Sequence, residues 1–131
     1  MILLTVDEDP AVLQHSLGIL KKVGGSHEVH TASSLEIAEK SSRELARIDV
    51  VILPTAASGG ETFFAFRDTL RGRFPKLHVL FLTDFDVSEY ADRLGGDPVL
   101  PKLPDEQALS DWARSIGFGT HVVDNLTWLE F

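Results

Sequence analysis

Four side chains in this sequence could act together in one polar site: Asp7, Glu8, Thr83 and Lys102. Each lies within two residues of the end of a short apolar run that predicts a strand. Parallel strands place their carboxyl ends at one edge of a sheet, so these groups are expected to converge there. Paired carboxylates in a concave site repel each other unless a cation lies between them, and Lys102 is the simplest candidate. The alternative is that all four are ordinary, solvated loop residues.

The elements that would position these residues alternate regularly between strand and helix. Short runs rich in Val, Ile and Leu predict buried parallel strands. These strands cover residues 2–6, 28–31, 48–53, 77–82 and 99–100. Helix signals follow each strand, the clearest being Asp9-Pro10 and Ser34. The helices cover residues 10–23, 34–45, 63–70, 88–94 and 105–116. This alternation predicts an α/β, flavodoxin-like, doubly wound five-stranded parallel sheet of order 2-1-3-4-5 with helices on both faces.

Several short segments, in their order and spacing, resemble a known family. They are residues 6–10, 31–34, 49–53, 82–83 and 101–102. Together they resemble the receiver domain of bacterial two-component response regulators over residues 1–116. In such receivers an acidic pair binds magnesium, an aspartate ending the third strand takes the phosphoryl group, a Ser or Thr contacts it, and a lysine neutralises its charge. The resemblance assigns these positions to Asp7 and Glu8, residue 54, Thr83 and Lys102.

Two departures set this chain apart from the receiver pattern. Residue 54 is Pro54, which carries no oxygen nucleophile, so aspartyl-phosphate chemistry is impossible at that position. The aromatic switch residue that the family places three positions before the lysine is Val99 here. The resemblance therefore implies a degenerate receiver, or pseudo-receiver, that acts in two-component signal transduction or a phosphorelay by phosphorylation-independent protein–protein interaction and is not an enzyme. Without a carboxylate at residue 54, Lys102 is expected to form a permanent ion pair with Asp7.

The same departures set the expected cofactors and partners. A hard divalent cation needs several oxygen ligands, and Pro54 supplies none from its side chain. We therefore expect magnesium to bind to Asp7 and Glu8 weakly or not at all, and we expect no other cofactor. The expected partners are signalling proteins or an attached effector domain, with a second copy of the chain as an alternative.

Composition narrows the remaining function classes. Asp and Glu outnumber Lys and Arg by 20 to 12, giving a net charge of −8, which disfavours direct binding to nucleic acid or to an anionic membrane. The sequence has no cysteine, which excludes disulfides, thiolate nucleophiles and Cys-ligated metals. No apolar run reaches the roughly 18 to 20 residues of a membrane span, and the first run is too short for a signal peptide. A cytoplasmic location is expected.

Two rival functions remain open. The receiver could be regulated through another acceptor, such as Thr55 or Thr83, or by a small ligand in the vacated site. In a different class, the chain could be a small flavodoxin-like enzyme or a cofactor-binding domain. That function predicts a phosphate-cradling glycine loop after a strand, and the sequence has no such motif.

Other polar residues are interpreted as structural or solvated. Arg67, Arg71, Arg73 and Lys76 form a basic stretch that predicts a solvated face, with a docking patch for an acidic partner as the alternative. The five histidines lack the short spacing of a zinc site and are expected at the surface or half-buried.

The chain divides into a receiver-like domain, residues 1–117, and a C-terminal tail, residues 118–131. The tail is too apolar for a flexible linker. We expect it to pack on the domain or in an interface, with Trp128 and Phe131 as the contact residues, because aromatic side chains dominate small interfaces.

Overall fold

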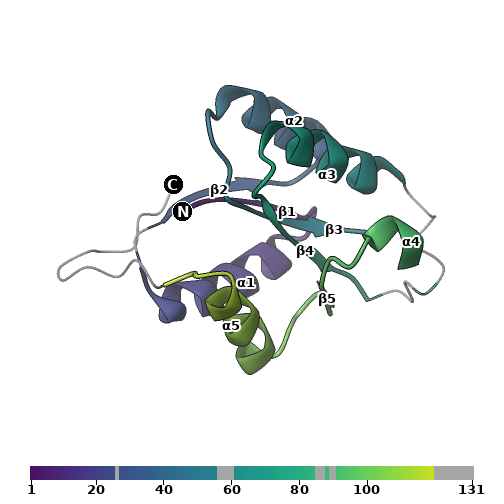
Figure 1. The fold of residues 1–131 in the computed structure, drawn as a ribbon. Helices are drawn as coiled ribbons and strands as arrows, with labels where there is room; N and C mark the ends of the chain where they lie inside the picture. Colours follow the sequence, from purple (N-terminus) through teal and green to yellow (C-terminus); the bar gives the residue numbers. More distant parts are fainter. Residues whose placement is uncertain (26, 56–60, 85–87, 89–90, 120–131) are drawn as a thin grey trace.

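The computed structural model describes residues 1–25, 27–55, 61–84, 88 and 91–119. In this part of the chain, five strands form one parallel sheet of order β2-β1-β3-β4-β5, with helices on both faces (Figure 1). The strands are β1 (Ile2–Val6), β2 (Glu28–Ala32), β3 (Val50–Pro54), β4 (His78–Leu82) and β5 (Val99–Leu100). The helices are α1 (Pro10–Val23), α2 (Leu35–Glu44), α3 (Glu61–Arg73), α4 (Ala91–Leu94) and α5 (Glu106–Ser115). The predicted doubly wound, flavodoxin-like fold is confirmed. None of the described helices has the length and apolarity needed to cross a membrane.

The strands form where apolar and β-branched residues follow one another without interruption. In β3, Val50, Val51, Ile52 and Leu53 are each at most 1% exposed. Such uniform burial is typical of a central parallel strand that is covered on both faces. β3 accordingly lies between β1 and β4 in the sheet.

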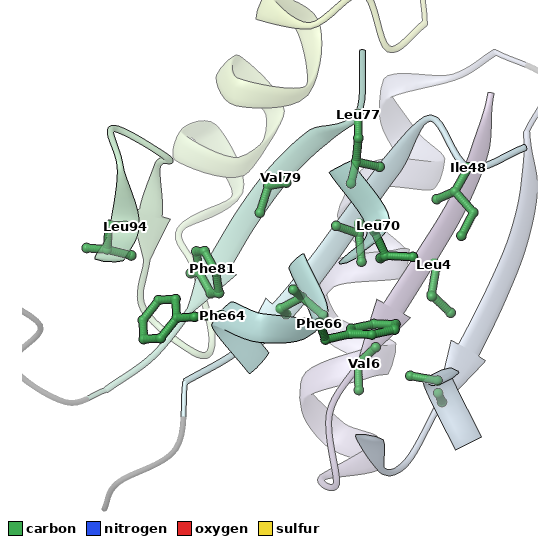
Figure 2. Close-up of a cluster of buried hydrophobic side chains, with 14 residues drawn as sticks. Leu4, Val6, Ile48, Phe64, Phe66, Leu70, Leu77, Val79, Phe81 and Leu94 are labelled. Atoms are coloured by element: carbon green, nitrogen blue, oxygen red, sulfur yellow. The ribbon is translucent and has the colours of Figure 1, made fainter. Parts of the chain in front are cut away.

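Two hydrophobic cores lie on opposite faces of the sheet. α1 and α5 cover one face, where Leu20 and Leu109 pack against strand residues that include Leu3. α2 and α3 cover the other face, where Phe64 lies 5.2 Å from Phe81 between ring centroids (Figure 2). Successive residues of a strand point to opposite faces, so each strand contributes to both cores. This double layer keeps the strand ends in fixed positions.

Capped helix starts lie at the edge of the sheet where the strands end. Asp9 accepts a hydrogen bond from the backbone N of Ala11 at 2.9 Å and begins α1, as predicted. Ser34 and Asp105 cap α2 and α5 in the same manner. The turn from β1 to α1 therefore spans only residues 7–9, which holds Asp7 at the carboxyl end of β1.

Several predicted element boundaries differ from the structure by one to three residues. The third strand was expected over residues 48–53, but β3 begins at Val50 and includes Pro54. Asp49 directly precedes the strand, and its carboxylate accepts a hydrogen bond from the backbone N of Ile2 at 2.7 Å and binds Arg47. Proline is tolerated because it is the last residue of the strand. The short fourth helix is described as α4, and residues 89 and 90 of its predicted range lie outside the described residues.

The interpretation of the basic stretch as a solvated face is wrong for Arg67. Its side chain is 6% exposed, and Nη1 lies 3.1 Å from the Asp97 carboxylate and donates to the Leu94 carbonyl. Arg71 also binds Asp97, at 2.9 Å, and Arg73 donates to carbonyls at the C-terminal end of α2. These arginines tie α3 to neighbouring elements, because their acceptors come from segments distant in sequence.

The expectation of surface or half-buried histidines is wrong for His27. It is 1% exposed, its ring stacks on Phe118 with centroids 3.8 Å apart, and Nε2 lies 3.0 Å from the Gly24 carbonyl oxygen. Phe118 is the first residue of the predicted tail, and it is buried against the core of α1 and α5. Trp128 and Phe131 lie outside the described residues.

Candidate functional site

An open cavity of about 620 Å³ lies at the carboxyl ends of the strands. Four of the predicted site residues line it: Asp7, Glu8, Pro54 and Lys102. Thr83, the fifth, directly follows β4 and is 6% exposed, but it does not line the cavity. The predicted convergence therefore holds for the two acids and the lysine, and these groups share the cavity with the proline.

Asp7 and Lys102 form the ion pair that was expected from the sequence. Lys102 Nζ donates to Asp7 Oδ2 at 2.5 Å. The other carboxylate oxygen of Asp7 accepts a hydrogen bond from the backbone N of Asp9 at 3.0 Å. The Asp7 side chain is only 4% exposed and that of Lys102 is 19% exposed, so the pair is largely shielded from solvent. Both oxygens of Asp7 are thus occupied by protein donors, as a buried carboxylate requires.

Asp84 holds the segment that carries Lys102. Its Oδ1 accepts a hydrogen bond from the backbone N of Lys102 at 3.1 Å, and the backbone N of Thr83 donates to the Leu100 carbonyl at 2.9 Å. These contacts fasten the end of β4 to the end of β5. Sequence analysis assigned no role to Asp84, although its position directly after Thr83 at a strand end is a usable signal.

The cavity combines apolar surface with polar groups. Pro54 and Phe63 belong to its lining, together with Leu103, which is 58% exposed. Thr55 also lines it and is 6% exposed, but its Oγ1 has no hydrogen-bond partner among the described residues. Glu8 lines the cavity from an exposed position.

Val99, the residue at the predicted switch position, is half-buried in β5. It pairs with Phe81 of β4 and packs against the core on the α2 and α3 face. A valine has only a short side chain with restricted χ1 rotation. It therefore cannot move between a buried and an exposed position as an aromatic ring could.

The functional groups that line the cavity limit the chemistry that this site can perform. The side chains that line the cavity include carboxylates, hydroxyls and one ammonium group, but the last residue of β3 supplies no side-chain oxygen. Within the described ranges, no group of three or more His, Cys, Asp or Glu side chains is arranged to hold a metal ion. The polar side chains of the lining can bind a polar group through hydrogen bonds and ion pairs.

Comparison with known proteins finds similar solved structures. No family model matches the sequence, and no curated protein sequence matches it. Among solved structures, the chemotaxis response regulator CheY4 of Vibrio cholerae is 22% identical, with a TM-score of 0.71 over 88% of this chain and 97% of that one. A response regulator receiver domain protein from Clostridium thermocellum is 26% identical, with a TM-score of 0.67 over 88% of this chain and 92% of that one.

A third similar structure comes from a protein named for a different role. It is a putative pilus assembly protein, CpaE, from Burkholderia thailandensis, which is 20% identical with a TM-score of 0.71 over 89% of this chain and 98% of that one. The chain is thus similar along most of its length to domains of the receiver type. It has the CheY-like, flavodoxin-like fold of response regulator receiver domains.

Proposed function

We propose that this chain is an atypical receiver domain that acts in signal transduction by phosphorylation-independent protein–protein interaction. The observation that carries the proposal is Pro54, which ends β3 and lines the cavity where a phosphorylated receiver presents its aspartate. Proline has no side-chain oxygen that could attack phosphorus or carry a phosphoryl group. The receiver-like fold supports the proposal, and Pro54 provides no acceptor at the position that the resemblance assigns to it.

The ion pair at the site supports the same function. In a receiver, the lysine at this position neutralises the phosphoryl group. Here Lys102 Nζ already binds Asp7 at 2.5 Å within a largely buried pair. Recruiting this lysine to a phosphoryl group would leave the Asp7 carboxylate buried without its counter-ion, which is energetically costly.

Weak or absent magnesium binding is part of the proposal. Magnesium demands several oxygen ligands in near-octahedral geometry. The donors present do not fit this ion, because both oxygens of Asp7 are engaged and Pro54 offers no side-chain donor. Glu8, which follows β1, lines the cavity from an exposed position.

We propose that this site serves to bind partner proteins and not to convert a substrate. The neighbours in structure include a signal receiver domain from an HD domain-containing protein of Pseudomonas fluorescens, in which the receiver is one part of a longer protein. We propose that this chain likewise binds signalling proteins or an attached effector domain in the cytoplasm. The exposed Leu103 beside the cavity offers an apolar contact for such a partner.

Acetyl phosphate treatment tests the proposal. The full chain is incubated with acetyl phosphate and magnesium, beside a receiver that has the aspartate, and the intact masses are recorded. We expect the control protein to gain the mass of one phosphoryl group and this chain to gain none. A phosphoryl group mapped to Asp7, Glu8 or Asp84 would show that a neighbouring acid accepts it, and the phosphorylation-independent function would be wrong.

A further inference from the structure

Residues 117–119 dock against the turn that ends α1, at the edge of the sheet opposite the cavity. The backbone N of Phe118 donates to the Ala113 carbonyl at 2.9 Å, and its buried ring stacks on that of His27 with centroids 3.8 Å apart. His27 directly precedes β2 and Met1 directly precedes β1, so this contact lies at the amino ends of the strands. The start of the C-terminal tail is therefore held on the domain through a contact with a titratable side chain.

Two glycines allow the chain to approach His27 this closely. Gly25 and Gly119 have positive φ angles of 98° and 87°. A Cβ at Gly25 would lie 2.5 Å from His27 Nε2 and 3.2 Å from the Cα of Gly119. A Cβ at Gly119 would lie 3.1 Å from the Val23 carbonyl oxygen. The backbone thus closely confines the His27 ring on its Nε2 side.

The partners of the His27 ring define the charge that fits its site. Nε2 lies 3.0 Å from the Gly24 carbonyl oxygen, which can only accept, so Nε2 carries a proton. Nδ1 lies 3.3 Å from the nitrogen of the Met1 amino group, so these two nitrogens can share one hydrogen bond. When the amino group is an ammonium, Nδ1 accepts from it and the ring is neutral. Protonation of Nδ1 would place two cations against each other at a residue that is 1% exposed.

The other charges near the ring do not relieve this conflict. Burial lowers the pKa of the Met1 amino group from its usual value of 8.0, against the charge of Asp49 and together with that of Arg47. Lys21, in the last turn of α1, is exposed and adds positive charge. The remaining charged side chains at the end of α1, on β2, at residues 47–49 and on α5 pair as Lys22 with Glu106, Glu28 with His30, Arg47 with Asp49, and Arg114 with Asp111.

We propose that the contact between His27 and Phe118 is sensitive to acid and holds residues 117–119 on the domain only while the His27 ring is neutral. Protonation sets the ring against the Met1 ammonium group, and the imidazolium has to leave its buried site to become hydrated. Phe118 then loses the ring on which it stacks, and the start of the tail is released. The proposal goes beyond the proposed function and does not depend on the cavity.

NMR relaxation of the full chain tests the proposal. The ¹⁵N order parameters of Phe118 and Gly119 are measured from about pH 8 to about pH 5, the range in which histidine ordinarily changes charge. The ¹³Cε1 shift of His27 reports protonation of its ring. We expect order parameters of about 0.85 in neutral solution that fall below about 0.6 in acid, with the same midpoint as the His27 shift. Asp49 keeps its charge in this range, because its pKa lies below 3.8.

Three variants separate the ring's charge from its shape. His27→Phe keeps a ring on which Phe118 can stack but cannot be protonated, so residues 117–119 are expected to stay docked in acid. Gly119→Ala is the reference for the released state, because its Cβ would crowd the Val23 carbonyl, and low order parameters are expected at every pH. His30→Gln is the matched control, since His30 also titrates on β2 but pairs with Glu28. It is expected to leave the midpoint unchanged.

Several outcomes would overturn the proposal. One is a His27 shift that stays constant over the whole pH range, and another is a ring that titrates while Phe118 and Gly119 keep their order. Release in acid by His27→Phe, or loss of the acid response in His30→Gln, would assign the effect to another group. A loss of order at Val51 in β3 with the same midpoint would show that the whole domain unfolds. The wild-type midpoints decide the question even where His27→Phe does not fold.

Discussion

Lys102 Nζ lies 2.5 Å from Asp7 Oδ2 across the cavity, although the two residues are 95 positions apart in the sequence. Their exposures differ, at 4% for the Asp7 side chain and 19% for that of Lys102. Removing one partner of an ion pair costs most when the charge left behind cannot reach water. The two partners are therefore not equivalent.

The substitution Lys102→Met is expected to lower the free energy of unfolding by about 2 to 3 kcal/mol, because it leaves the Asp7 carboxylate buried without its counter-ion. Asp7→Asn is expected to cost only about 1 kcal/mol, since the Lys102 ammonium can turn into solvent and the amide oxygen still accepts from Asp9 N. Urea unfolding of both variants and of the double variant measures the coupling. Equal losses in the two single variants, or additive losses in the double variant, would contradict this account.

Arg67 is expected to matter more to stability than its neighbour Arg71. Both bind Asp97, but the Arg67 side chain is 6% exposed and that of Arg71 is 38% exposed. Arg67 also donates to the Leu94 carbonyl and lies over the rings of Phe64 and Phe81. We expect Arg67→Met to cost about 2 to 3 kcal/mol in urea unfolding and Arg71→Met less than about 1 kcal/mol. The reverse order would show that Asp97 depends mainly on the exposed arginine.

Asp49 gives the fold a pH-dependent contribution. Burial raises the pKa of its carboxyl, but hydrogen bonds from Arg47 and the Ile2 backbone, with the charge of Arg47, outweigh that effect, and the pKa lies below the usual value of 3.8. A carboxyl with a lowered pKa in the folded state stabilises the protein above its unfolded pKa. This contribution is lost as the pH falls through the folded pKa.

Comparison of the wild type with Asp49→Asn should therefore depend on pH. At neutral pH we expect the wild type to be more stable by about 1 kcal/mol, since the variant weakens charge-assisted hydrogen bonds at a partly exposed site. The difference is expected to shrink as the pH falls below 3.8 and to vanish in more acid solution. Urea unfolding at a series of pH values measures it. A difference that stays constant on acidification would show that Asp49 acts only through its shape.

The sequence was sufficient to predict the features that depend on local signals. β1 and α1 have the predicted bounds, because the apolar run stops at Asp7 and Asp9-Pro10 starts a helix at once. The pair of Asp7 and Lys102 was predictable for a related reason, since both residues lie at strand ends and parallel strands end at one edge.

Features that depend on distant partners were not predictable. Arg67 looked like a member of a basic surface stretch, and its acceptors when buried, the Leu94 carbonyl and Asp97, lie 27 and 30 residues away. His27 likewise depends on Phe118, which stacks on it from beyond the end of α5. Asp49 was placed within a strand, and the contact of its carboxylate with the backbone N of Ile2, 47 residues away, left no local signal. Tertiary contacts override local pattern at each of these positions.

The substitution Pro54→Asp is expected to create a magnesium site at the cavity. A carboxylate at the buried end of β3 would join Asp7 and Glu8 at the cavity, and the crowded negative charge would destabilise the free protein. Magnesium would relieve this repulsion, so we expect the ion to raise the Tm of the variant and to leave that of the wild type unchanged. Asp7→Ala added to the variant is expected to abolish the effect. Phosphorylation of the variant by acetyl phosphate is expected to be weak. Changes in the backbone amide NMR shifts are expected only for residues at the cavity, because Val99 cannot serve as an aromatic switch. Tight magnesium binding by the wild type that disappears in Asp7→Ala would show that the site is complete without an acid at residue 54.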